Sequence, residues 1–215
     1  MNTTTRSIST NRRLQWAYDR IASDYARTNA VSSVEYRDHF GPALLRCSTP
    51  LAAPVPPRLL DIGCGAGRDM AWFEAAGAQV VGVDLSSGML AEARVRASGP
   101  LVQMDMRALG FASETFHGVW CAASLLHLPK IEAPTVLQEI HRILTAGGVL
   151  FLAVQAGEGE RWETGAYGHP VERFFARYSP EEIVTLLAEH GFAVREHDAG
   201  DAGVRRWLRF LATRR

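Results

Sequence analysis

The sequence predicts one α/β domain of the Rossmann-like type, with a parallel sheet and helices on both of its faces. Short apolar runs at 59–62, 79–85 and 101–106 are typical of strands that are buried on both sides. Segments with helical spacing, such as 134–144, alternate with these runs, which favours a parallel sheet. The 215 residues are enough for one well-buried domain and tight for two.

The composition predicts a small soluble enzyme. Hydrophobic residues make up 47% of the chain and charged residues 21%, which is ordinary for a globular protein. Lys plus Arg equals Asp plus Glu at 23 each, so no net field attracts nucleic acid or an anionic membrane. No run approaches the ~20 apolar residues that a membrane span needs. We therefore expect neither nucleic acid nor a membrane as partner.

The cysteines and the N-terminal residues indicate the cellular compartment of the protein. Cys47, Cys64 and Cys121 are odd in number and form no C-x-x-C pair, which argues against a disulfide framework and a metal site. Residues 1–11 are rich in Thr, Ser and Asn without an apolar core, so we expect a disordered tail and no secretory signal. A reducing cytoplasm is the expected location.

A glycine-rich turn follows the first apolar run and is the strongest indication of a ligand site. Its spacing is Asp61-x-Gly63-x-Gly65-x-Gly67, and glycines let the backbone approach a ligand closely. A carboxylate before the first glycine would repel a phosphate but suits a cationic ligand. Asp84 ends the next apolar run and is placed to accept hydrogen bonds from two ribose hydroxyls.

Five segments together resemble class I S-adenosylmethionine-dependent methyltransferases: LLDIGCGAGRD, VVGVDLSSGML, LVQMDM, FHGVWCAASLLHLP and LTAGGVLFLAV. The resemblance runs from about residue 59 to residue 154. It implies a seven-stranded sheet completed by an antiparallel C-terminal strand pair, and an N-terminal helical lid. It also implies a cytoplasmic transferase of EC class 2.1.1 that uses S-adenosylmethionine, yields S-adenosylhomocysteine and methylates a small molecule.

The resemblance also implies which residues bind the cofactor. In it, the carboxylate of Asp105 accepts the adenine amino group and the amide of Met106 meets a ring nitrogen. Ordinary core packing is the alternative for Met89, and a solvent-facing loop position is the alternative for Asp105. The full set of expected cofactor contacts is Tyr25, Asp61, Gly63, Cys64, Gly65, Asp84, Leu85, Met89, Asp105, Met106 and Ala122.

His127 is the catalytic candidate. A histidine with a pKa near neutrality could act as a general base during methyl transfer, and the alternative is a contact to the cofactor or a neighbouring loop. The segment 18–26 resembles the Y-D-x-x-A-x-x-Y stretch of small-molecule methyltransferases, which implies that Tyr18 or Tyr25 faces the active site; packing of the helix is the alternative. No Asn-Pro-Pro-Tyr-like signature follows 116–124, which argues against methylation of nucleic-acid bases.

The domain prediction divides the chain into a tail at 1–11, N-terminal helices and a linker at 12–57, and a cofactor-binding core at 58–154. A polar, glycine-rich lid loop follows at 155–179, and a helix with a strand pair at 180–215, with strands at 192–196 and 204–213. Expected substrate contacts are Tyr18, Trp162, Arg173 and Tyr178, although the lid aromatics could instead only pin a surface loop. Arg173 could pair with a substrate carboxylate.

Two other functions remain open from sequence. One is a non-catalytic S-adenosylmethionine-binding or regulatory protein, which the motifs do not exclude. The other is a nicotinamide-dependent oxidoreductase, against which the glycine spacing and Asp61 count. The acceptor atom (oxygen, nitrogen, sulfur or carbon) is open, as is the choice between monomer and homodimer. No metal is expected.

Overall fold

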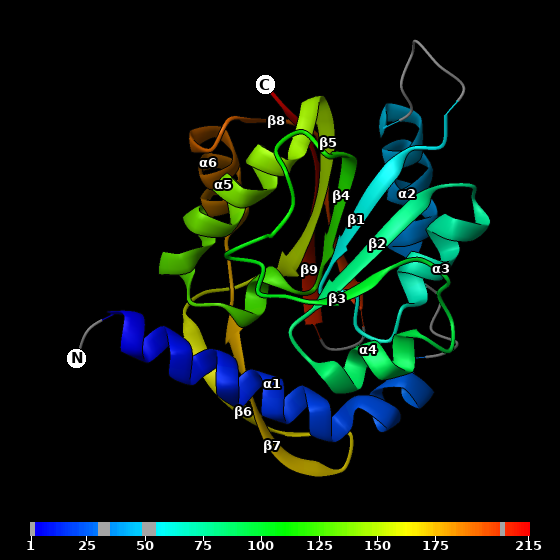
Figure 1. Cartoon of the computed structure of the whole chain (residues 1–215). Helices are drawn as coiled ribbons and strands as arrows, with labels where there is room; N and C mark the ends of the chain where they lie inside the picture. Colours follow the sequence, from blue (N-terminus) through cyan, green and yellow to red (C-terminus); the bar gives the residue numbers. More distant parts are fainter. Residues whose placement is uncertain (1–2, 30–34, 49–54, 203–204) are drawn as a thin grey trace.

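The computed structural model describes residues 3–29, 35–48, 55–202 and 205–215. Within these residues the main sheet has the strand order β3-β2-β1-β4-β5-β9-β8 (Figure 1). The parallel strands are β1 (Arg58–Ile62), β2 (Gln79–Asp84), β3 (Leu101–Gln103), β4 (Phe116–Ala122) and β5 (Leu144–Gln155). The strands β8 (Phe192–Ala202) and β9 (Arg205–Arg214) pair antiparallel at one edge. The predicted seven-stranded Rossmann-like sheet is confirmed.

Helices cover both faces of this sheet. On one face lie α2 (Glu35–Ser48) and α3 (Arg68–Ala75), and on the other α5 (Ala133–Ile143) and α6 (Pro180–Glu189) (Figure 1). Separate apolar clusters fill the two faces, one around Trp120 and Phe151 and one around Ile140 and Phe210. Because strands β1, β4 and β5 are covered on both sides, their residues are apolar almost throughout.

Local sequence explains where the helices begin. Ser179 accepts a hydrogen bond from the amide of Glu182, whose side chain accepts one from the amide of Ser179, so α6 begins with a capping box. The helix α4 (Ser87–Ala93) begins at Ser86, which accepts a hydrogen bond from the amide of Met89. Short 3₁₀ turns, η1 (Leu125–His127) and η2 (Lys130–Glu132), connect β4 to α5.

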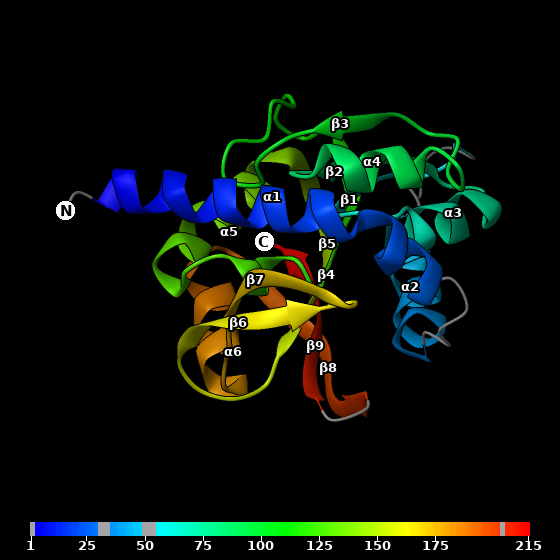
Figure 2. The same cartoon turned by 90° about the horizontal axis from the view of Figure 1, so that it is seen from below.

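A long helix crosses the carboxyl edge of the parallel strands. This helix, α1 (Thr3–Thr28), lies against α4 and β7 (Figures 1 and 2). The expected disordered tail at 1–11 is therefore wrong from Thr3 onward. Leu14 is buried and Asn11 bonds to Asp105, so tertiary contacts anchor the helix. The residues before Asn11 extend an existing helix and avoid the cost of helix nucleation. No helix in the described ranges is long and apolar enough to cross a membrane.

The expected lid loop at 155–179 is instead mostly a β-hairpin. Its strands β6 (Glu160–Ala166) and β7 (His169–Ala176) form a separate two-stranded sheet beside α1 (Figure 2). Gly165, Tyr167 and Gly168 have positive φ angles of 88°, 52° and 82° and form the hairpin turn. The glycines that suggested a loop, Gly157 and Gly159, precede β6. The predicted connection at 197–203 is also too long, because β8 continues to Ala202.

Candidate active site

The glycine-rich turn lies at the carboxyl end of β1. The amides of Gly63 and Cys64 donate to the carbonyl of Val83 at 2.8 and 3.0 Å, which fixes the turn against β2. Gly63 has a φ of 70°, and a Cβ there would lie 2.4 Å from the Cβ of Ser124. Only glycine fits this position, and the turn leaves an open hollow above it.

Asp61 supplies a buried carboxylate beneath the turn. The residue is 3% exposed, and its Oδ2 has no hydrogen-bond partner among the described residues. Burial, with the nearby charges of Asp69 and Asp84, raises the pKa of this carboxyl well above its usual value. A buried acceptor without a partner fits a cationic ligand such as an ammonium group.

The carboxylate of Asp84 is oriented by backbone amides. Gly65 donates to its Oδ2 at 2.9 Å and Ser86 to its Oδ1 at 2.8 Å. Burial raises the pKa of Asp84, and these amide hydrogen bonds oppose that rise. Each carboxylate oxygen keeps a further acceptor position, so Asp84 can accept two hydroxyl groups, as a ribose requires.

The glycine-rich turn and Asp84 open onto one cavity at the carboxyl edge of the sheet, which we call the cofactor cavity. Nine of the eleven expected cofactor residues line it: Tyr25, Gly63, Gly65, Asp84, Leu85, Met89, Asp105, Met106 and Ala122. The other two, Asp61 and Cys64, line an adjoining hollow that shares Tyr25, Gly63 and Ala122 with the cavity. The sequence motifs therefore converge in space.

Asp105 has protein partners in the cavity wall. Arg107 lies 2.6 Å from its Oδ2 and also pairs with Glu132 at 2.6 Å. Burial alone would raise the pKa of Asp105, but the Arg107 guanidinium holds it below its ordinary value. The Nδ2 of Asn11 donates to the same carboxylate at 2.6 Å, and the buried Oδ1 of Asn11 has no partner within the described chain. Because Asn11 falls in the expected tail at 1–11, this free acceptor could not be predicted from sequence.

A second pocket adjoins the cofactor cavity. The two share Tyr18, Tyr25, Ala123 and His127, and Ala123 has a positive φ of 57° at the end of β4. We call it the arginine pocket, because its wall includes Arg68, Arg173, Arg205 and Arg209 together with Gln155 and the rings of Tyr36, Tyr167, Phe175 and Trp207. Of the expected substrate residues, Tyr18 and Arg173 line it.

Tyr18 and His127 meet where the two hollows join. The Nδ1–H of His127 donates to the carbonyl of Phe174 at 2.7 Å. Its Nε2 therefore accepts from the hydroxyl of Tyr18, 2.6 Å away. Burial lowers the pKa of His127 to about 4 and raises that of Tyr18 to about 12. The expectation of a near-neutral histidine pKa is contradicted, because the half-buried imidazole has lost part of its contact with water.

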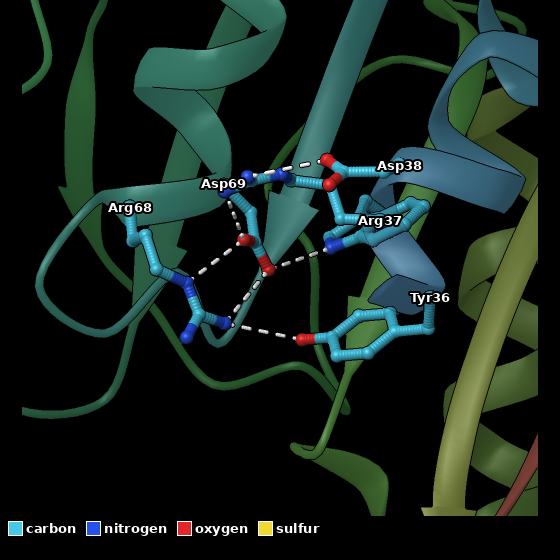
Figure 3. A network of polar contacts seen from close by, with 6 residues as sticks. Tyr36, Arg37, Asp38, Arg68 and Asp69 are labelled. Atoms are coloured by element: carbon cyan, nitrogen blue, oxygen red, sulfur yellow. Dashed lines mark hydrogen bonds and ion pairs between the residues drawn. The ribbon is translucent and has the colours of Figure 1, made fainter. Parts of the chain in front are cut away.

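A polar network fastens α2 to the glycine-rich turn (Figure 3). Arg68, directly after the turn, donates to Asp69 at 3.0 Å and to the hydroxyl of Tyr36 at 3.1 Å. Arg37 approaches Asp69 at 3.6 Å, and the indole of Trp120 donates to the same carboxylate at 3.1 Å. Tyr36 is thereby positioned in the wall of the arginine pocket.

Two expected substrate residues lie elsewhere. Trp162 packs against Phe174, with ring centroids 5.6 Å apart, and beneath the guanidinium of Arg13 at 3.7 Å. Tyr178 is 2% exposed in the apolar core and has the ammonium of Lys130 over its ring. Neither lines the cofactor cavity or the arginine pocket. Their prediction as acceptor contacts is corrected: both residues are packing positions.

Comparison with known proteins bears on this arrangement. Residues 60–152 match the family model described as a methyltransferase domain. Over 152 residues the chain is 35% identical to a malonyl-[acyl-carrier protein] O-methyltransferase of Enterobacter lignolyticus. The aligned region covers 66% of this chain and 60% of the relative. The chain is 33% identical over 135 residues to a demethylmenaquinone methyltransferase of Clavibacter sepedonicus, covering 61% of this chain and 53% of the relative. The chain thus spans little more than half the length of these relatives.

A solved structure shares the fold. The 1,6-didemethyltoxoflavin N1-methyltransferase of Burkholderia thailandensis, with bound 1,6-didemethyltoxoflavin and S-adenosylhomocysteine, aligns with a TM-score of 0.62 at 22% identity. The alignment covers 92% of this chain and 90% of that one. At this identity the likeness establishes the shared fold.

Proposed function

We propose that this chain, which belongs to the class I S-adenosylmethionine-dependent methyltransferases, transfers the methyl group of S-adenosylmethionine to a small-molecule acceptor. One observation carries the proposal: the unpaired, buried Oδ2 of Asp61 lies beside a cavity in which Asp84 has free acceptor positions. A ligand with both an ammonium group and a ribose satisfies both carboxylates. A ligand with a pyrophosphate would bring negative charge to Asp61 instead.

The cofactor would be held by residues from the ends of three strands and from α1 and α4. Asp61 would bind its ammonium group, Asp84 its ribose hydroxyls, and Asn11 and Met106 its adenine edge. Met89 and Leu85 line the apolar part of the cavity. When bound, S-adenosylmethionine supplies a methyl group already activated by a sulfonium. The protein therefore needs mainly to align the acceptor and exclude water, which can lower a barrier by about 7–11 kcal/mol.

The chain's own residues divide this work. The helix α1 closes the edge of the cavity, and Asp19 fixes it there by accepting from the hydroxyl of Ser86 at 2.6 Å and the amide of Gly88 at 2.8 Å. We assign Tyr18 to the wall between cofactor and acceptor. His127 is its positioning residue, because the lone pair of Nε2 is already used by the Tyr18 hydroxyl.

The acceptor would enter through the arginine pocket, which meets the cofactor cavity at Tyr18, Tyr25, Ala123 and His127. A concave pocket lined by α1, α2, the hairpin, β5 and β9 suits a metabolite better than a nucleic-acid strand. Cys64 and Cys121 are free, buried thiols, which fits a reducing compartment. We propose a cytoplasmic enzyme that acts as a monomer or homodimer.

Incubation with tritiated S-adenosylmethionine tests the function. Each reaction contains one acceptor class, namely organic acids, phenols, amines, thiols, transfer RNA or a protein mixture, and the readout is tritium in the acceptor. Label in a small molecule, lost in Asp61→Ala, is expected. Binding of the cofactor without transfer to any class would instead favour the non-catalytic alternative.

A further inference from the structure

Arg173 is a buried cation that lacks a carboxylate partner within the described residues. It is 8% exposed, and its Nε has no hydrogen-bond partner. By contrast, Arg205 pairs with Glu163 at 3.6 Å and Arg209 with Asp198 at 3.3 Å. Burying an unpaired guanidinium is costly, so its charge is available for a ligand.

Neutral groups hold Arg173 in place. Its guanidinium lies 5.1 Å from the ring centroid of Phe175 and 5.8 Å from that of Tyr167, and it lies beside the hydroxyl of Tyr18, where it opposes the rise of the Tyr18 pKa. Aromatic faces and a hydroxyl orient a cation, but they do not neutralise it. The side chain is thus fixed in direction without an ion pair in the described ranges. Glu163 lies opposite Arg173 across the hairpin, but its carboxylate pairs with Arg161, Arg177 and Arg205.

The surrounding pocket is built from donors and rings. No Asp or Glu occurs among the described residues that line the arginine pocket. Gln155 is 2% exposed, and its Nε2 is a second buried donor without a partner. Tyr36 and Trp207 add flat apolar surface to the same wall. Two orphaned donors beside aromatic rings fit an anionic oxygen group on a flat apolar body.

The position of Arg173 relates this anion site to the chemistry. Tyr18, beside which Arg173 lies, lines both the cofactor cavity and the arginine pocket. An anion held by Arg173 therefore lies near the junction of the two. The lone pair of His127 Nε2 is used by Tyr18, and no carboxylate from the described part of the chain lines the pocket to serve as base. An acceptor oxygen that is already ionised needs none.

We propose that the acceptor is a small aromatic acid whose carboxylate is bound by Arg173 and Gln155 and is itself methylated, giving a methyl ester. This inference rests on the proposed function. A carboxylate lone pair forms the new O–CH₃ bond while the C–S bond breaks and its electron pair goes to sulfur. The negative and the positive charge disappear together, and no proton is transferred.

Binding to protein saturated with S-adenosylhomocysteine tests the anion site. Benzoate, phenylphosphonate and benzamide are titrated by calorimetry into wild type, Arg173→Gln, Arg173→Lys and Arg161→Gln. Arg161 is the matched control, because it lies on the same hairpin and is 69% exposed in its pair with Glu163. We expect benzoate to bind, benzamide not to bind, and Arg173→Gln to weaken benzoate at least 10-fold. Arg173→Lys and Arg161→Gln should stay within a few-fold of wild type.

Several outcomes would overturn the inference: no benzoate binding, equal binding of benzamide, or benzoate affinity unchanged in Arg173→Gln. Binding of phenylphosphonate in place of benzoate would overturn the carboxylate assignment. The affinity of each variant for S-adenosylhomocysteine is measured first, because an unchanged affinity shows that the variant is folded. If wild type itself does not bind S-adenosylhomocysteine, the proposed function fails, which is a separate result.

Product chemistry tests the second half of the proposal. Tritiated S-adenosylmethionine is supplied with benzoate, cinnamate and 4-hydroxybenzoate, the last of which offers both a carboxylate and a phenol. A methyl ester releases volatile labelled methanol on treatment with alkali, whereas a phenol ether keeps the label. We expect alkali-labile product, reduced at least 10-fold by Arg173→Gln. Alkali-stable product, or transfer to none of the three acids, would overturn the ester assignment.

Discussion

The hydroxyl of Tyr18 on α1 lies 2.6 Å from Nε2 of His127, which follows β4. Because Nδ1 donates to the carbonyl of Phe174, one imidazole joins the helix, the sheet and the hairpin. The ring of Tyr18 also meets that of His127 edge to face, with centroids 5.2 Å apart. The contact fixes the wall between the cofactor cavity and the arginine pocket.

Substitution Tyr18→Phe tests the strength of this contact. It keeps the ring but leaves the buried Nε2 of His127 without a donor, so we expect the free energy of unfolding to fall by about 1–3 kcal/mol. Tyr167→Phe is the control, because its hydroxyl accepts from Asn29 at 3.1 Å and that donor also bonds to the carbonyl of Tyr25 at 2.9 Å. Urea denaturation measures both. An equal loss in the two variants would contradict the role given to the Tyr18–His127 bond.

His127 should make the protein sensitive to acid. Its pKa is lowered from 6.5 to about 4 by burial, so between these values the unfolded chain binds a proton that the folded chain does not. Stability therefore falls as the pH is lowered through this window, by up to about 3 kcal/mol at 1.36 kcal/mol per pKa unit.

Urea denaturation between pH 4 and pH 7 checks this, with His127→Asn as the comparison. Asn keeps a donor toward Phe174 but does not titrate, so the difference in stability between the two proteins should depend on pH. A constant difference across the range would show that His127 titrates normally in the folded state.

The buried carboxylate of Asp61 should destabilise the folded chain, although cofactor binding requires it. Burial raises its pKa in the folded state, so the folded chain binds the extra proton and stability is lost as the pH rises through the raised value. Asp61→Asn removes that loss, and near neutral pH we expect a higher melting temperature, by about 2–4 °C for each kcal/mol regained. The same variant should lose S-adenosylhomocysteine binding. A melting temperature that falls would mean that the carboxylate is compensated within the protein.

Asn11 should recognise the adenine amino group through its free Oδ1. We expect Asn11→Ala to weaken S-adenosylhomocysteine about 10-fold, as the loss of one hydrogen bond predicts. S-inosylhomocysteine, which lacks that amino group, should bind both proteins alike. Gln15→Ala on the same helix, in the same cavity wall, is the control. An equal loss for both ligands would assign Asn11 a purely structural role.

The part of the site nearest the glycine-rich turn could be predicted because its signals are local. Asp61 and Asp84 end consecutive parallel strands that pair directly, so their carboxylates meet at one edge whatever the rest of the chain does. The N-terminal helix could not be delimited in this way. Its polar first turns gave no apolar period, and only contacts such as Asn11 to Asp105 hold it in place.

The residues of the arginine pocket could not be predicted from local sequence. Their positions depend on the strand register of the hairpin and on segments that lie far apart in the chain. Trp162 pairs with Phe174 across the hairpin, so both side chains lie on one face while that of Arg173 lies on the other. No local pattern distinguishes these two faces. Gln155 reaches the arginine pocket from β5 and Trp207 from β9, and only the folded sheet brings them beside Arg173.

Calorimetric titration with S-adenosylhomocysteine and with NAD, in wild type and Asp84→Asn, tests the central claim most directly. S-adenosylhomocysteine should bind wild type at micromolar strength, and Asp84→Asn should weaken it at least 10-fold, because an amide cannot accept from both ribose hydroxyls while it accepts from the amides of Gly65 and Ser86. NAD should not bind either protein. Binding of NAD without S-adenosylhomocysteine would contradict the account and indicate hydride transfer.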